Sequence, residues 1–124
     1  MRPKENFSNL YPKNTKTYHQ SNYSIKTTLT SRTQHPGDKI FYFASKPSRT
    51  GLLLPRKEAY DRLQNSGISE VNSENIAYIY LKKPSIYKNP EDGSVYPPHY
   101  HYVLWSTYQK CWGKKVYTVD LCMV

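Results

Sequence analysis

The chain is poor in the residues that would place it in several common protein classes. Its 124 residues include only 2 Cys, 5 Gly and 3 Phe, and 9 acidic residues stand against 18 Lys and Arg. Two cysteines cannot supply the dense disulfide framework of a small secreted domain. No apolar run approaches the roughly 20 residues of a membrane-spanning helix, and no apolar segment follows the charged N-terminus. We therefore expect no membrane span and no secretion signal.

Positive charge and tyrosine are the two abundant features. The net charge is +9, and 13 residues are Tyr. Residues 1–37 hold six bases and one acid, a net +5, whereas residues 38–124 hold twelve bases and eight acids, a net +4. More than half of the positive excess thus falls in the first third of the chain, in a polar segment without helical or strand periodicity. The sequence predicts an extended basic arm over 1–37 and a folded domain over 38–124.

The arm is expected to bind partners, because tyrosine gives a large contact area with a polar tip and is enriched at interfaces. Such an arm either wraps its own domain or lies on a neighbouring protein. A nucleic-acid strand is the alternative partner, through phosphate contacts and stacking on the rings, although no known nucleic-acid-binding motif accompanies the charge. The candidate partner-binding residues are Arg2, Lys4, Tyr11, Lys13, Lys16, Tyr18, Tyr23, Lys26 and Arg32.

The domain over 38–124 shows the pattern of a small β-sandwich. Four segments rich in aromatic and β-branched residues predict strands, at 39–44, 76–81, 99–105 and 116–122, with turn signals between them. Pro55, the helix-forming residues 56–64 and the stop at 65–67 predict one short helix. The expected fold is therefore mainly β, with one short helix and the extended N-terminal arm.

The segment with the clearest chemistry is the His99-Tyr-His101 sequence. Alternate residues of a strand point to one face, so the two imidazoles should project side by side. Two such nitrogens can ligate one transition-metal ion. The alternatives are that the two histidines are polar surface residues, or that they form a hydrogen-bonded cluster with Tyr87 between the sheets.

The residues around this pair resemble the intradiol ring-cleavage dioxygenases, which bind Fe(III). The similarity covers about residues 38–121 and is strongest over 84–102, where Pro84-Ser-Ile-Tyr87 precedes Glu91-Asp-Gly93 and Tyr96-Pro-Pro-His99-Tyr-His101-Tyr follows. The same block resembles small uncharacterised proteins of large DNA viruses. The resemblance implies a transthyretin-like β-sandwich.

The resemblance also implies a metal site. Tyr87, His99 and His101 match three of the family's four iron ligands, Tyr60 is the candidate for the fourth, and Tyr42 is an alternative to it. Two positions depart from the family pattern: Tyr96 stands for an arginine and Val119 for a glutamine. Because those polar groups steady the oxidised substrate, their loss favours a scaffold without dioxygenase activity and makes a small-molecule substrate an unfavoured partner.

Cys111 and Cys122 flank the last turn and strand, and they could form one disulfide or remain free thiols. Taken together, the sequence predicts a non-enzymatic structural or interaction protein that docks on neighbours in a large assembly. The viral resemblance makes a minor capsid or virion component, in the virion or the cytoplasm of the infected cell, the concrete expectation. An Fe(III) intradiol-type dioxygenase and a nucleic-acid-binding module are the two alternatives.

Overall fold

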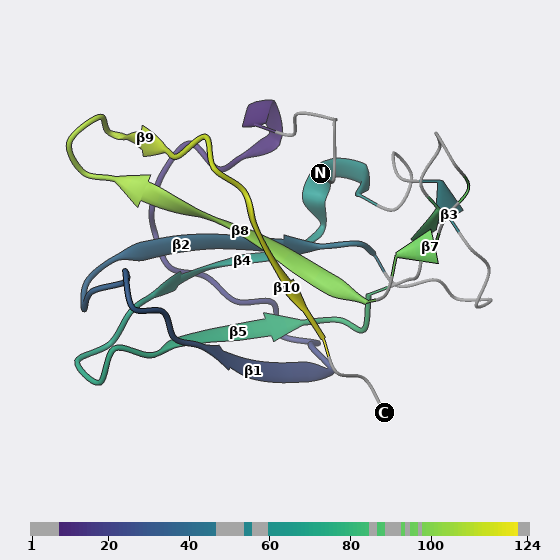
Figure 1. The fold of residues 1–124 in the computed structure, drawn as a ribbon, viewed down its shortest axis with the longest axis horizontal. Helices are drawn as coiled ribbons and strands as arrows, with labels where there is room; N and C mark the ends of the chain where they lie inside the picture. Colours follow the sequence, from purple (N-terminus) through teal and green to yellow (C-terminus); the bar gives the residue numbers. More distant parts are fainter. Residues whose placement is uncertain are drawn as a thin grey trace.

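The structure of the protein is a computed structural model that describes residues 8–46, 54–55, 60–84, 87–88, 93, 95–96 and 98–121. The fold is mainly β, as the sequence predicts (Figure 1). The strands are β1 (Ile25–Leu29), β2 (Lys39–Ala44), β3 (Leu54–Pro55), β4 (Asn65–Glu70), β5 (Ala77–Leu81), β6 (Tyr87–Lys88), β7 (Val95–Tyr96), β8 (His99–Ser106), β9 (Cys111–Trp112) and β10 (Tyr117–Asp120). Among these residues, no helix is long and apolar enough to cross a membrane.

Two antiparallel layers build the sandwich. The larger sheet has the order β10-β8-β2-β4, and β9 extends the far end of β8. The second layer is the pair β1-β5, which runs below the larger sheet in Figure 1. A small third sheet, β3-β6-β7, lies at one end of the molecule. The predicted strands at 39–44, 76–81, 99–105 and 116–122 correspond to β2, β5, β8 and β10.

The central strand β2 of the larger sheet is buried on both faces because its side chains are apolar on both sides. Ile40, Tyr42 and Ala44 of β2 face the β1-β5 layer and pack with its Leu29 and Ile79. The intervening residues belong to a second cluster on the opposite face, whose members are Phe41, Phe43, Tyr60, Leu63, Ile68 and Val103, with Tyr11 and Trp112 at its margin. A strand buried on two sides lacks polar alternation, which explains the unbroken apolar run of β2.

Part of the predicted arm over residues 1–37 belongs to the sandwich itself. Ile25–Leu29 forms β1 and pairs with β5 along its whole length, from Ile25 opposite Leu81 to Leu29 opposite Ala77. Further upstream, Tyr18 exchanges backbone hydrogen bonds of 3.1 and 3.0 Å with Ile68 of β4. The described part of the arm therefore wraps its own sandwich and supplies one of its strands.

The expected helix over 56–64 is not an α-helix in its described part. Only a 3-10 turn, Asp61–Leu63, is present there, and residues 56–59 lie outside the described residues. Arg62 and Leu63 have φ angles of 54° and 49°, in the left-handed region that a continuing right-handed helix excludes. Burial explains the difference: Tyr60 and Leu63 are both drawn into the cluster around Phe43.

Candidate functional site

The two histidines of β8 lie side by side, as strand alternation predicts. The imidazole centroids of His99 and His101 are 4.8 Å apart, with their planes at 74°. Both side chains are almost fully buried, with exposed fractions of 1% and 0%. Tyr100 and Tyr102, which alternate with them, pack into the opposite core against the β1-β5 layer. The pair is thus an interior feature of the sandwich and not part of its polar surface.

Tyr60, the candidate fourth ligand, joins these histidines from the segment before η2 (Asp61–Leu63). Its hydroxyl oxygen lies 3.1 Å from His99 Nε2, and its ring centroid is 5.7 Å from that of His101. Tyr60 is 1% exposed and meets the edge of Phe43 at 6.2 Å. The structure therefore brings together three of the residues that the sequence singles out.

Tyr42, the alternative to Tyr60, is not part of this cluster. It lies on the other face of β2, where its hydroxyl is 2.8 Å from His19 Nδ1 and accepts the backbone N–H of Tyr80 at 3.3 Å. Burial raises the pKa of Tyr42 far above the value of a free phenol. A neutral, hydrogen-bonded phenol between the layers has a structural role.

Tyr87 is placed by its backbone alone. It stands in β6, opposite Leu54 of β3 and Tyr96 of β7, and its side chain lies outside the described residues. The side chain of Tyr96, which the resemblance aligns with an arginine, also lies outside them. The assignment of Tyr87 as a ligand stays a prediction.

Thr118 is a member of the site that the sequence analysis missed. It is opposite His101 in the β8–β10 register, and its Oγ1 lies 2.9 Å from His101 Nδ1. Val119, which the resemblance aligns with the family's glutamine, packs instead against the core on the other face. Strand alternation in β10 could have predicted this, because adjacent residues of a strand face opposite sides and Thr118 and Val119 must therefore point to different faces.

The donor atoms gathered here are two imidazoles and one phenol. Among the described residues, no group of three or more His, Cys, Asp or Glu could hold a metal ion. Imidazole suits iron, and a phenol can ligate a ferric ion once coordination lowers its pKa. The donor chemistry of Tyr60, His99 and His101 therefore fits ferric iron. The set contains only two residues of the types that most often bind metals, the two histidines.

The predicted partner-binding residues divide between the interior and the surface. Tyr11 packs on Phe41 and Phe43 at 5.5 and 5.9 Å between ring centroids, so its ring contacts its own domain. The exposed members are Lys13, Lys16, Tyr18, Tyr23, Lys26 and Arg32. Arg2 and Lys4 lie outside the described residues.

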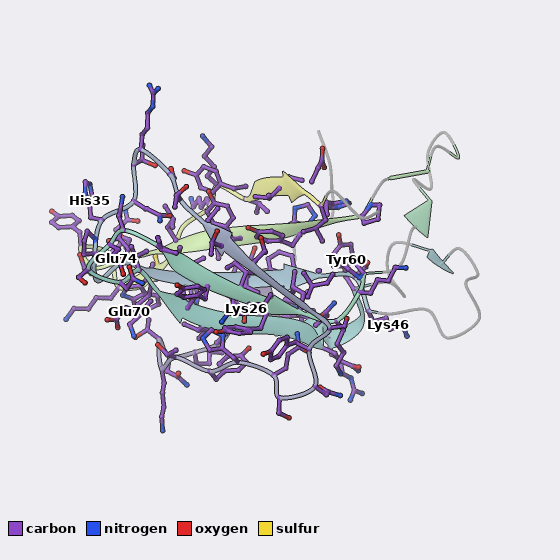
Figure 2. All side chains as sticks on the ribbon, turned by 90° about the horizontal axis from the view of Figure 1, so that it is seen from below. Lys26, His35, Lys46, Tyr60, Glu70 and Glu74 are labelled. Carbon is purple, nitrogen blue, oxygen red and sulfur yellow. The ribbon has the colours of Figure 1, made fainter. Side chains whose placement is uncertain are left out.

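Two of these exposed residues, Tyr23 and Lys26, contact aromatic side chains on the outer side of the β1-β5 layer. We call His19, Tyr23, Lys26, Tyr78 and Tyr80 the tyrosine–lysine face. The Lys26 ammonium lies over the rings of Tyr78 and Tyr80, at 5.1 and 5.6 Å from their centroids. Tyr80 also contacts His19 and Tyr23, at 4.4 and 4.8 Å. Figure 2 looks onto this layer, with Lys26 near its middle and Glu70 and Glu74 toward one end.

The sequence leaves a disulfide between Cys111 and Cys122 and two free thiols as alternatives. Cys111 is exposed and carries a free thiol in the structure. Cys122 lies outside the described residues. The pairing therefore stays a prediction.

Comparison with known proteins adds no family to this description. No protein-family model matches the chain, and no curated protein matches it. What the fold and site define is a small β-sandwich with a buried tyrosine–histidine cluster and an exposed aromatic, basic face.

Proposed function

We propose that this protein is a non-enzymatic structural or interaction protein that binds a neighbouring protein chain in a larger assembly. The observation that supports this most is the tyrosine–lysine face. Tyr78 and Tyr23 remain 37% and 43% exposed although both are large and amphipathic. Exposed aromatic groups gathered in one place are typical of interaction surfaces.

Charge indicates the kind of partner. Lys26 lies opposite Tyr80 and Thr28 opposite Tyr78 across the two strands. Among the described residues of β1 and β5, none is acidic. A surface of tyrosines around a lysine is complementary to a partner that presents carboxylates beside an apolar contact. We therefore expect an acidic patch on the neighbouring chain.

The resemblance to small proteins of large DNA viruses gives this proposal its concrete form, a minor capsid or virion component. The departures from the dioxygenase pattern support a non-enzymatic role. The residue aligned with the family's glutamine, Val119, is apolar and packs on the face of the sheet opposite His101. The side chain of β10 that faces the histidines is Thr118, whose hydroxyl is shorter than a glutamine amide and is already hydrogen-bonded to His101.

Sedimentation with the native assembly tests the proposal. Tagged full-length protein with Tyr78→Ser is made in the cells that naturally contain the protein and is fractionated by sedimentation. We expect the variant to shift from the fast-sedimenting fraction to the free fraction. Tyr108→Ser is the matched control, because Tyr108 is 95% exposed in a turn away from the tyrosine–lysine face. Equal assembly of the two variants would argue against docking through this face.

An Fe(III) intradiol-type dioxygenase is the second candidate, favoured by one observation: Tyr60, His99 and His101 converge in the interior. These three residues and Tyr87, which the resemblance matches to an iron ligand, would hold the iron. Bound ferric iron would supply the redox chemistry for cleaving a catechol ring with oxygen. The protein's own residues would orient the ligands, as Thr118 orients His101.

Visible absorption after iron is added distinguishes the dioxygenase from the non-enzymatic interaction protein. Ferric iron bound to a tyrosinate absorbs visible light, so the full chain loaded with iron should be coloured. Tyr60→Phe should lose part of the absorption, because Tyr87 is the other predicted tyrosinate ligand. Tyr108→Phe serves as the control. A protein that stays folded and colourless after iron is added would exclude the dioxygenase.

A further inference from the structure

A second surface, on the opposite side of the larger sheet, forms a pocket of about 310 Å³. It lies between the β8–β9 hairpin and the start of the described arm, and its lining includes Tyr11, Lys13, Trp105, Lys110, Cys111 and Trp112. Its volume is at the lower end of the range for small-ligand sites. The pocket is separate from the tyrosine–lysine face and from the Tyr60–His99–His101 cluster, so it requires its own explanation.

Aromatic side chains form the walls of this pocket. Trp105 and Trp112 are cross-strand partners in the hairpin, with ring centroids 5.2 Å apart and planes at 78°. Trp112 is held in place, because its Nε1–H donates to the carbonyl of Pro12 at 2.9 Å and its ring contacts Phe41 at 5.9 Å. Fixed aromatic walls favour a flat ligand, since little side-chain freedom is lost when it binds.

The charged groups at the pocket are positive. Lys13 approaches from the arm and Lys110 from the hairpin turn, and none of the described lining residues is acidic. Lys110 is held by the turn itself, where its N–H donates to Ser106 O at 2.7 Å and its φ is 55°. The carboxylate of Glu70, on the same face of the sheet, already forms an ion pair with the ammonium of Lys39, with 2.8 Å between Oε1 and Nζ. An anion is therefore the ligand that this lining favours.

We propose that this pocket binds a nucleotide, either free or as one unit of a single strand. The base would pack against the indoles of Trp105 and Trp112, and the phosphate would lie between the ammonium groups of Lys13 and Lys110. Stacking of bases on aromatic side chains beside lysines is the usual way in which proteins hold single-stranded nucleic acid. This inference goes beyond the proposed function, which concerns the other layer of the sandwich.

Tryptophan fluorescence tests the proposal in the full chain. The chain has only two tryptophans, and both line the pocket, so quenching of their emission, excited at a wavelength that tyrosine does not absorb, reports on the surroundings of this site. We expect adenosine monophosphate and a short oligodeoxyadenylate each to quench it, less strongly at higher salt. Lys13→Ala and Lys110→Ala should each weaken binding about tenfold. Lys16→Ala is the matched control, an exposed arm lysine outside the pocket lining, and should bind as the unchanged protein does.

The two ligands distinguish the sources of the nucleotide. Tighter binding of the oligonucleotide assigns the site to a single strand, and equal or tighter binding of the monophosphate assigns it to a free nucleotide. Absence of quenching by both would overturn the proposal. So would equal weakening in the Lys16 control, which indicates unspecific charge attraction, or quenching by an acidic peptide alone, which indicates a protein partner.

Cys111 gives an independent readout, because its thiol is exposed and lines the same pocket. In a Cys122→Ser background it is the single cysteine of the chain. Saturating nucleotide should slow its alkylation by a maleimide severalfold. An unchanged alkylation rate, with binding seen by fluorescence, would place the ligand elsewhere and overturn the assignment.

Discussion

The hydroxyl of Tyr60 lies 3.1 Å from Nε2 of His99, although the two residues are 39 positions apart in the chain. Tyr60→Phe removes this hydrogen bond and keeps the ring that packs on Phe43. We expect the free energy of unfolding to fall by about 0.5–1.5 kcal/mol, the net worth of a typical hydrogen bond. Urea denaturation measures the change. Tyr108→Phe, at an exposed position, should leave the midpoint unaltered, and equal stability of both variants would show that the contact contributes nothing.

The strand β1 should be indispensable to the sandwich. Leu29 is buried against the β2 and β5 side chains, whereas its neighbour Thr28 is exposed. Leu29→Ala should cost about 2–5 kcal/mol by leaving a cavity, and Thr28→Ala less than about 0.5 kcal/mol. Both are read from thermal or urea unfolding.

Deletion of residues 1–37 extends the same argument. It removes β1 and uncovers Ala77, Ile79 and Leu81, all of which are buried in the intact chain. We expect the shortened chain to lose cooperative unfolding in circular dichroism. A truncated protein with a sharp transition would show that the sandwich does not need its second layer completed by β1.

Gly67 should tolerate no side chain. A Cβ at this position would overlap the phenol of Tyr42 and approach the carbonyl oxygen of Tyr18 to 2.9 Å. Gly67→Ala should therefore destabilise the fold by about 1–3 kcal/mol, the usual cost of overpacking. Adding Tyr42→Phe, which removes one of the overlapping atoms, should recover part of the loss. If the single variant is as stable as the unchanged protein, the close packing described between β4 and β2 is incorrect.

Acid should weaken the fold through His19. Partial burial lowers the pKa of His19, so the folded state favours the neutral ring, and its Nδ1 lies 2.8 Å from the Tyr42 hydroxyl. The unfolded chain then binds more protons below about pH 6.5, and stability falls as the pH decreases from there to the lowered pKa. Imidazole titration by NMR measures the shift directly. His19→Gln should reduce the acid sensitivity of unfolding, and a His19 pKa at or above the free value would contradict the account.

The strands that the sequence analysis predicted correctly are those with an unmistakable composition. Residues 39–44 form an unbroken apolar and aromatic run, and residues 99–105 are dominated by aromatic rings. The same pattern placed His99 and His101 on one face. The sequence could not reveal that Tyr60 meets them, because this depends on how the segment before η2 folds onto β2. Tyr60 was singled out only because the resemblance to the dioxygenases implies a further tyrosine ligand upstream of Tyr87.

The strands that were missed have sequences whose local preference differs from their structure. β4 reads Asn-Ser-Gly-Ile-Ser-Glu, a sequence typical of a turn. Tertiary contacts overcome that preference: the Asn65 side chain donates to the carbonyls of Ser45 and Lys82 and accepts the N–H of Lys82. β1 was hidden in the polar arm because only Ile25 and Leu29 mark its inner face. In both segments, pairing with a neighbouring strand determines the structure more than the local sequence preference does.

Site-directed photo-cross-linking tests the proposed docking face most directly. A benzophenone amino acid replaces Tyr78 in one sample and Tyr108 in another, and both are irradiated within the native assembly. We predict one dominant adduct with a neighbouring protein chain from position 78 and none from position 108. Adducts of equal yield from both positions, or none from position 78, would contradict the proposal that the tyrosine–lysine face binds a partner.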